Sequence, residues 1–244
     1  MTKLPIKAIF FDLDETLVEN HIPVRKLFPT VFFNFVDQIG EEHKHVFFEH
    51  LQTQVNGLWL NMFAQDIAPE QQLVNCFIKA LNKTRAIPAI KVPSLAKQMV
   101  AHFIDLASNN VEMHEGAIET LEELRRHKLT VGLITNGMVS IQMGKIKTLG
   151  IEPYFDNITI SAEARVHKPE KPIFDLALSR ANANADQAWF VGDHITNDIA
   201  GAVRAGLHSI YYNPTYLDTE SSFANVVERP DYTIHSLPEI LEYL

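Results

Sequence analysis

The sequence contains little cysteine, no long apolar run and no excess of basic residues. Its single cysteine, Cys76, cannot form a disulfide within the chain, which is typical of proteins of the reducing cytoplasm. No uninterrupted apolar stretch approaches the ~20 residues that a bilayer core requires. The first apolar run, 8–11, ends at Asp12 before it could serve as a signal peptide. These absences predict a cytoplasmic protein with no membrane partner.

The charge balance argues against a second class of partner. The 21 Lys and Arg residues are outnumbered by 30 Asp and Glu residues, so the net charge is −9. Because a negative field repels a polyphosphate backbone, we expect no nucleic-acid partner. A small anionic substrate is compatible with this charge where a metal or a local cation reverses the sign. The sequence predicts no particular oligomeric state.

What the sequence does contain is typical of a globular α/β protein. Hydrophobic residues make up 46% of the 244 residues, enough for a sizeable core. Short apolar runs typical of buried strands lie at 8–11, 131–134, 158–160, 189–191, 210–212 and 232–234. Helical patterns at 118–124, 140–149, 173–181 and 199–205 separate most of them. Strands that alternate with helices predict a parallel sheet with helices on both faces.

The segment from residue 21 to 111 has a different pattern, with no convincing strand. Apolar residues recur there at helical spacing, as in the series Leu73, Phe77 and Leu81. The segment is divided into four or five expected helices at Pro23, Pro69, Pro88 and Pro93. We therefore predict a helical subdomain, 21–111, inserted into a core formed by 1–20 and 112–244, with Cys76 buried among its helices.

Two carboxylates follow the first predicted strand directly. Asp12 and Asp14, with Thr16 two residues further on, stand at the carboxyl end of that strand, where open α/β sheets bind ligands. One carboxylate of such a pair can act as nucleophile and metal ligand, and the other as acid and base. A solvated acidic turn has the same pattern, so this motif alone decides nothing.

Polar residues also follow two later elements. Thr135 and Asn136 end the next strand before a helix, where a hydroxyl, an amide and main-chain N–H groups can bind an anion or simply cap the helix. Lys168 precedes the helix that begins near Pro172, and a lone loop lysine is usually solvated. Together these residues are candidates for phosphate binding.

A second group of acids follows the strand at 189–191. Asp193, Asn197 and Asp198 come directly after it, so their side chains are expected at the same sheet edge as Asp12. Carboxylates gathered there repel one another unless a cation is present, and oxygen ligands suit a hard divalent ion, with Mg²⁺ fitting best. The alternative is that Asp193 and Asp198 only cap the following helix.

These ordered motifs resemble the haloacid dehalogenase-like hydrolase superfamily, and the resemblance covers essentially the whole chain. It implies a Rossmann-like core and, for an insertion in this place, a helical C1-type cap. By the same resemblance Asp12 is the nucleophile and Asp14 the general acid/base, while Thr135, Asn136 and Lys168 hold the phosphoryl group. The resemblance implies that Mg²⁺ is bound by the Asp12 carboxylate, the Asp14 main-chain carbonyl and Asp193. The expected supporting residues are Thr16, Asn197 and Asp198.

The residues favour phosphoryl transfer over the other reactions of this fold. In a dehalogenase Asp14 and the distal acids would have no function, because the halide leaves without a proton and the haloacid substrate needs no metal. A phosphomutase shares the acid pair and stays open. A phospho-acceptor domain or an inactive binding module is disfavoured by the large helical insertion and by the complete set of motif residues.

The substrate is expected to be a small phosphomonoester. The stretch from Asn56 to Trp59 resembles the cap of pyrimidine 5′-nucleotidases of the YjjG type, which implies a nucleoside 5′-monophosphate and makes Asn56 and Trp59 candidates for specificity. Sugar phosphates, acylneuraminate 9-phosphate and phosphoglycolate are the alternatives. Because Gly57 lies in this stretch, we expect a helix to break there. The break would place Trp59 at the cleft between cap and core; the alternative is that Trp59 packs between the cap helices as a core residue.

Overall fold

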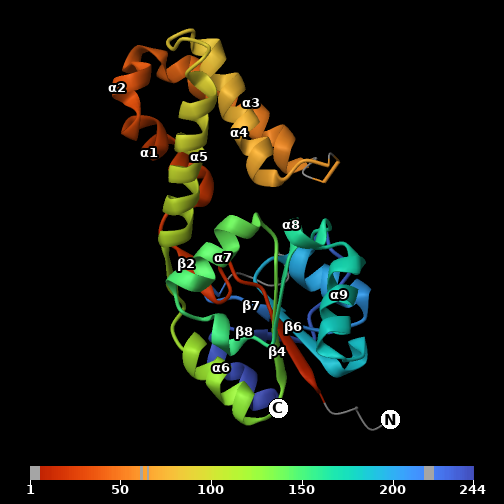
Figure 1. The fold of residues 1–244 in the computed structure, drawn as a ribbon. Helices are drawn as coiled ribbons and strands as arrows, with labels where there is room; N and C mark the ends of the chain where they lie inside the picture. The colour runs from red at the N-terminus through yellow and green to blue at the C-terminus, as the bar shows by residue number, and fades with distance from the viewer. Residues whose placement is uncertain (1–5, 61–62, 65, 217–222) are drawn as a thin grey trace.

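A sheet of six parallel strands forms the centre of the structure, which is a computed structural model (Figure 1). The structure describes residues 6–60, 63–64, 66–216 and 223–244; for residues 59 and 60 it describes the backbone only. The strands are β1 (Ala8–Phe11), β4 (Thr130–Thr135), β5 (Asn157–Ile160), β6 (Ala188–Gly192), β7 (His208–Tyr212) and β8 (Tyr232–Ile234). Their order is β5-β4-β1-β6-β7-β8, which confirms the predicted parallel α/β fold. The first strand therefore lies between β4 and β6, the strands that precede the other motifs.

Helices cover both faces of this sheet. On one face, Ile9 and Phe11 of β1 pack among residues of α6 (Ala117–Arg126), α7 (Val139–Thr148) and the 3-10 helix η6 (Leu237–Tyr243). On the other face, Ala8 and Phe10 pack against α9 (Lys171–Ala181) and α10 (Gly201–Ala205). This alternation follows from the two-residue period of a strand, and burial on both sides explains why the run is apolar throughout. The remaining core elements are η3 (Glu152–Tyr154), α8 (Ser161–Ala164), η4 (Ala185–Gln187) and the π-helical turn η5 (Ile195–Ala200).

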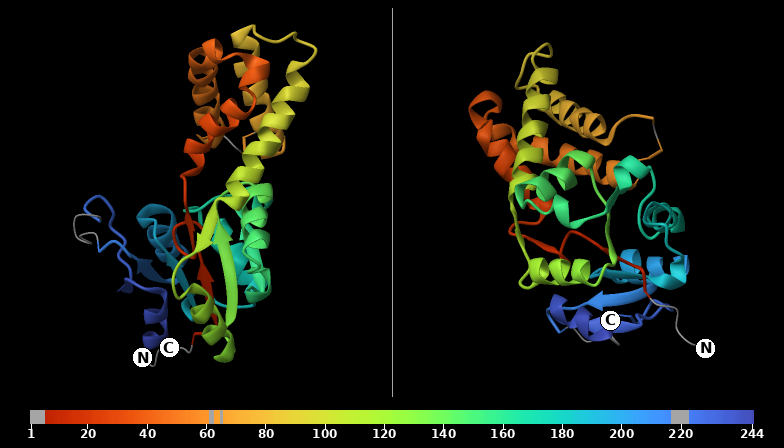
Figure 2. Two further views of the ribbon diagram at one scale, coloured as in Figure 1. Left: turned by 90° about the vertical axis from the view of Figure 1, so that its left-hand side faces the viewer. Right: turned by 60° about the horizontal axis from the view of Figure 1, so that its bottom comes forward.

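A helical cap stands over the carboxyl ends of the strands (Figures 1 and 2). It is joined to the core through a short antiparallel ribbon, β2 (Val18–Asn20) paired with β3 (Val111–Met113). The sequence analysis missed this ribbon because strands of three residues are too short to have a recognisable pattern. The cap helices are η1 (Val24–Lys26), α1 (Leu27–Asn34), α2 (Val36–Ile39), η2 (Glu41–His43), α3 (Lys44–Leu60), α4 (Pro69–Thr84) and α5 (Val92–Asn109).

The cap has its own apolar core, and that core continues into α7. Cys76 is buried in it, as predicted, and Met138 and Ile141 at the start of α7 belong to the same cluster. One expectation was wrong: α3 does not break at Gly57 but continues to Leu60. A glycine in a helix costs only about 1 kcal/mol, which burial of the neighbouring Val55 and Leu58 offsets.

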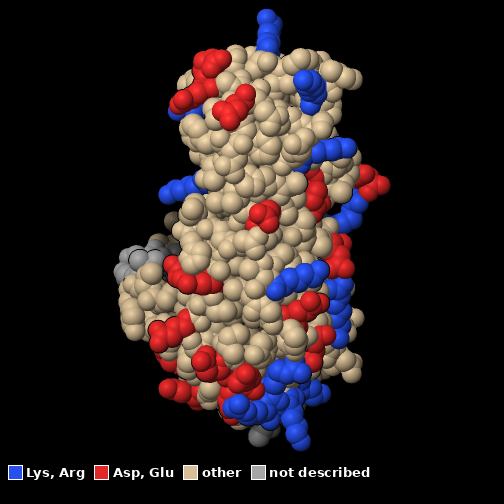
Figure 3. Space-filling model, turned by 60° about the vertical axis from the view of Figure 1, so that its left-hand side comes forward, with Lys and Arg blue, Asp and Glu red and all other residues tan. Residues whose placement is uncertain are grey.

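The outer surface has mixed charge. On the face shown in Figure 3, acidic and basic side chains are interspersed over the core and sparse over the cap. Among the described residues, no helix combines the length and the apolar character needed to cross a membrane.

Packing between α5 and α7 gives a test of how the cap is seated on the core. A Cβ atom at Gly144 of α7 would lie 2.6 Å from the Cβ of Ser108 in α5. We expect Gly144→Ala to lower the free energy of unfolding by ~1–3 kcal/mol through overpacking, measured by urea denaturation. Gly57→Ala is the matched control, since among the described residues no atom lies within 4 Å of its added Cβ. It should raise stability by ~0.5–1 kcal/mol, and equal effects at the two sites would contradict the prediction.

Candidate active site

The end of β1 places Asp12 against a buried lysine and a buried acid from other elements. Lys168 Nζ lies 2.7 Å from Asp12 Oδ1 and 2.7 Å from Asp198 Oδ1. All three side chains are almost completely buried. Neither contact is aligned as a hydrogen bond, so within the described chain Lys168 Nζ and Asp198 Oδ1 lack hydrogen bonds of good geometry. Buried polar atoms of this kind are normally satisfied, so a bound group is expected to complete the site.

A third acid joins this cluster. Asp12, Asp193 and Asp198 each offer one carboxylate oxygen, and these oxygens lie within 4.8 Å of one another. Thr16 donates from Oγ1 to Asp193 Oδ1 at 3.2 Å, and the main-chain N–H of His194 donates to Asp198 Oδ2 at 3.0 Å. When all are ionised, three carboxylates face one ammonium group, and a divalent cation would balance the two excess negative charges. The donor set, all oxygen, fits Mg²⁺.

Burial and repulsion between carboxylates both raise the pKa values of Asp12 and Asp193. Burial raises the pKa of Asp12 well above its usual value; Lys168 opposes this shift, and repulsion from Asp198 and Asp193 adds to it. Burial, with repulsion from Asp198, raises the pKa of Asp193 to about 6. Burial alone would lower the pKa of Lys168, but Asp12 and Asp198 outweigh it and raise the value. Asp12 and Asp193 therefore hold protons more tightly than usual until a cation joins them.

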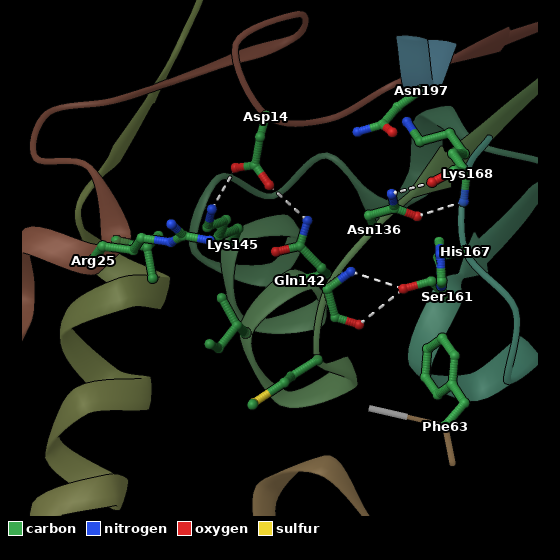
Figure 4. Close-up of a pocket in the computed structure, with 14 residues that line it drawn as sticks. Asp14, Arg25, Phe63, Asn136, Gln142, Lys145, Ser161, His167, Lys168 and Asn197 are labelled. Carbon is green, nitrogen blue, oxygen red and sulfur yellow. Dashed lines mark hydrogen bonds and ion pairs between the residues drawn. The ribbon is translucent and has the colours of Figure 1, made fainter. Parts of the chain in front are cut away.

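Asp14 points into a different set of partners. Lys145 forms an ion pair with its Oδ1, Asn20 donates to the same oxygen at 2.9 Å, and Gln142 donates to Oδ2 at 2.8 Å (Figure 4). Burial alone would raise the pKa of Asp14, but Lys145 and these hydrogen bonds lower it. The two motif carboxylates thus have opposite pKa shifts in the metal-free protein, so their electrostatic surroundings differ.

The ends of β4 and β5 form the floor beside Lys168. The Asn136 side chain accepts from the Lys168 main-chain N–H at 2.9 Å and donates to the Lys168 carbonyl at 3.0 Å. Its amide therefore fixes the lysine loop, which leaves the main chain of Asn136 for the predicted phosphate contact. Gly137 N–H donates to Ser161 Oγ at 2.9 Å, and Thr135 is buried with its hydroxyl bonded to Gln142.

Comparison with known proteins identifies the family. A family profile described as Haloacid dehalogenase-like hydrolase matches residues 9–212, most of the chain. The chain belongs to this family. It is therefore an enzyme of the haloacid dehalogenase-like hydrolase family, as the motifs predicted.

The relatives of this HAD-like hydrolase are named for several different activities. It is 27% identical to a ribulose-1,5-bisphosphate 5-phosphatase of Halopiger xanaduensis, over 96% of this chain and 98% of that protein. It is 35% identical to the pyrimidine 5′-nucleotidase YjjG of Escherichia coli, over 53% of this chain and 55% of that protein. A solved structure of a 2-haloacid dehalogenase from Pseudomonas syringae superposes with a TM-score of 0.76 and 26% identity, covering 98% of this chain and 99% of that one.

The candidate active site of this HAD-like hydrolase opens into a pocket of about 420 Å³ between core and cap (Figure 4). Phe63 of the cap lines it opposite His167, with ring centroids 5.8 Å apart. Arg25 lies at the end of the pocket away from Lys168, and Asn197 lines it near that lysine. This volume is within the range of small-molecule sites.

The predicted core residues lie at this pocket or beside it, whereas the predicted cap residues are not among the described residues that line it. The core motif residues converge as described above, and Asp198 lies in the same carboxylate cluster as Asp12 and Asp193. Asn56 is exposed on α3 and is not among the residues that line the pocket. The side chain of Trp59 lies outside the described residues, so the aromatic residue seen at the cleft is Phe63.

Sequence analysis missed several pocket residues. Gln142 and Lys145 are polar residues in the buried face of α7, beside Ile141 and Ile146, and this break in an apolar face is a signal that could have identified them. Phe63 and Arg25 had no such signal, because a cap residue reaches the site only through the way the cap packs on the core.

Proposed function

We propose that this HAD-like phosphatase hydrolyses a small phosphomonoester through an aspartyl-phosphate on Asp12 and requires Mg²⁺. The observation that carries the proposal is the buried cluster in which Asp12 and Asp198 flank Lys168 at 2.7 Å, with Asp193 beside them. Phosphoryl transfer needs an oxygen nucleophile and positive charge around the phosphoryl oxygens. Bound Mg²⁺ would supply charge neutralisation, held by the Asp12 and Asp193 carboxylates and the Asp14 carbonyl, with Asp198 adjacent.

The proposed reaction has two steps, phosphoryl transfer to Asp12 and hydrolysis of the aspartyl-phosphate, and Asp14 acts in both. An Asp12 oxygen attacks phosphorus as the bond to the leaving alkoxide breaks, and the alkoxide takes a proton from Asp14. Water then attacks the phosphoryl group, Asp14 takes its proton, and the bond to Asp12 breaks to release inorganic phosphate. Lys168, Thr135 and the main chain at Asn136 hold the phosphoryl oxygens. The lowered pKa of Asp14 favours the ionised form that accepts a proton in the second step, and it opposes the protonated form that the first step requires.

We propose a nucleoside 5′-monophosphate, with a pyrimidine base, as the preferred substrate. Phe63 and His167 line the pocket with rings inclined by 32°, so a planar base can stack on Phe63 while the phosphate lies at Lys168. The similarity to YjjG over half of the chain supports this choice.

A phosphorylated sugar with a second anionic group is the second candidate. Arg25 lines the cap end of the pocket, and among the described residues its guanidinium has no ion pair or hydrogen bond. Such a cation suits a second phosphate or a carboxylate. The full-length similarity to a ribulose-1,5-bisphosphate 5-phosphatase favours the same class.

A panel of phosphate esters with Mg²⁺ tests the proposal. It contains nucleoside monophosphates, sugar mono- and bisphosphates, phosphoglycolate and p-nitrophenyl phosphate, with inorganic phosphate as the measured product. A 2-haloacid is included with halide as its readout, and product isomers are separated by chromatography to detect a mutase. Halide release without phosphate release, or isomerisation without hydrolysis, would overturn the proposal.

Phe63 provides a prediction for the nucleotide. Phe63→Ala should raise the KM for a pyrimidine nucleoside 5′-monophosphate by ~5–150-fold, since stacking is worth ~1–3 kcal/mol per base. The KM for p-nitrophenyl phosphate should change little, because the phosphoryl contacts are unaltered. Phe33→Ala, at an exposed phenylalanine of α1 that does not line the pocket, is the control. An equal KM change on both substrates would count against a base-stacking role.

A further inference from the structure

Two buried polar side chains of α7 have no task in the mechanism above. Gln142 is 2% exposed and Lys145 is 1% exposed, although their helix neighbours pack into apolar clusters. Because they are three residues apart, both lie on the helix face that is turned toward Asp14. Replacing a buried ion pair by apolar side chains is often neutral or stabilising, so stability alone does not account for them.

The contacts of Gln142 fix the direction of its amide. Its Nε2 lies 2.8 Å from Asp14 Oδ2 and 2.6 Å from Thr135 Oγ1. An ionised carboxylate only accepts hydrogen bonds, so the group facing Asp14 must be the NH₂ and not the amide oxygen. The same NH₂ has a second hydrogen, which it donates to the hydroxyl of Thr135.

The direction of the Gln142 amide makes the Thr135 hydroxyl a hydrogen-bond acceptor. A hydroxyl that accepts a hydrogen bond from Gln142 keeps its own hydrogen for another acceptor. No acceptor for that hydrogen is found among the described residues, and Thr135 ends β4 beside the lysine that faces Asp12. Thr135 is buried and does not itself line the pocket, so this hydrogen can reach a phosphoryl oxygen only if that oxygen lies at the pocket floor beside Lys168.

Lys145 completes the arrangement from one helical turn further on. Its ammonium group pairs with Asp14 Oδ1 and donates to Asn20 Oδ1 at 2.8 Å. With Lys145 and Asn20 on one carboxylate oxygen and Gln142 on the other, the Asp14 carboxylate is held at both oxygens.

We propose that Gln142 and Lys145 are positioning residues: Gln142 orients the Asp14 carboxylate and the Thr135 hydroxyl together, and Lys145 holds Asp14 from the same helix. The inference rests on the proposed phosphatase function, because it assigns the partners of the proposed acid/base and of a proposed phosphate ligand. It adds two residues from α7 to a reaction that the motifs ascribe to other segments.

The first experiment needs no turnover. Binding of inorganic phosphate with Mg²⁺ is measured by calorimetry for the native chain, Gln142→Met, Thr135→Val and the double variant. We expect Gln142→Met to weaken binding by ~10-fold in the native chain and by less than ~2-fold in the Thr135→Val background. Equal losses in the two backgrounds would overturn the role through Thr135.

The second experiment tests the role through Asp14. Lys145→Met should lower kcat on an alkyl phosphate by ~10–100-fold with KM changed by less than ~2-fold, and should lower kcat less on p-nitrophenyl phosphate, whose leaving group needs little protonation. In the Asp14→Asn background Lys145→Met should have no further effect on kcat. Additive losses, or equal losses on both substrates, would overturn this role.

Isosteric and control variants separate positioning from packing. Gln142→Glu keeps the length and shape of the side chain but not the NH₂, so positioning predicts a loss as large as that of Gln142→Met, and near-native behaviour would overturn it. Lys145→Gln replaces Lys145→Met if the latter does not fold. Lys147→Met, on the exposed side of α7, should leave kcat and phosphate binding unchanged. If no phosphate ester is hydrolysed at all, the proposed function fails, while the calorimetric cycle still decides the positioning of Thr135.

Discussion

Asp12→Asn is expected to reduce phosphatase turnover by on the order of 10⁴-fold or more, the size typical of losing a nucleophile. An amide cannot attack phosphorus, and the change also withdraws a carboxylate from the group formed by Asp12, Asp193 and Asp198. The measurement is the initial rate of inorganic phosphate release from p-nitrophenyl phosphate and from the best ester of the panel, at saturating Mg²⁺.

Stability distinguishes this loss from unfolding. Burial and the neighbouring carboxylates already raise the pKa of Asp12, so replacing it by a neutral isostere relieves repulsion in the metal-free protein. The melting temperature without metal should therefore not fall. Asp186→Asn, at an exposed acid in η4 before the amino end of β6, should retain native turnover. A native rate for Asp12→Asn would place the nucleophile elsewhere.

Removal of divalent metal is expected to abolish turnover, and added Mg²⁺ to restore it. Without a cation the three carboxylates are balanced only by Lys168, so the phosphoryl group of an incoming substrate would meet excess negative charge. Protein treated with a chelator and dialysed is assayed before and after Mg²⁺ is returned, with Ca²⁺ and K⁺ as comparisons. Full activity in the treated protein would contradict the predicted metal requirement.

The pH dependence of the Mg²⁺ requirement follows from Asp193. Its pKa is raised to about 6 in the metal-free protein, so below that pH a proton must be displaced before the carboxylate can bind a cation. We expect the Mg²⁺ concentration for half-maximal activity to rise as pH falls from 7.5 to 5. A requirement that is constant over this range would argue against Asp193 as a ligand.

The central sheet was predictable because its signals are local. The inner strands β1, β4, β6 and β7 are buried on both faces, so their sequences are apolar runs whatever lies next to them. The six predicted runs became β1 and β4 to β8. The helical pattern of the cap is local in the same sense. The β2–β3 ribbon was missed because three residues provide no period, and the expected break in α3 was wrong because packing of neighbours outweighed one glycine.

The core of the candidate site was predictable for a related reason. In a parallel sheet every motif that follows a strand reaches the same edge, so strand pairing alone brings the ends of β1, β4 and β6 together. The order of these elements predicts that Asp12 and Asp198 lie at one sheet edge, whereas the contacts of Lys168 with both depend on the loop that follows α8. The tertiary structure added the distances and the shifted pKa values.

By itself, then, the sequence determined the fold class, the family motifs and the sheet edge at which they meet, since all three depend on local patterns and on strand order. Only the tertiary structure decided which side chains surround the two carboxylates that follow β1, Asp12 and Asp14, and what closes the pocket. Gln142 and Lys145 reach Asp14 because α7 packs beside it, and Phe63 reaches His167 because the cap is seated on α7. Such contacts join residues far apart in the chain, and their physical basis is the packing of whole helices, which no local pattern encodes.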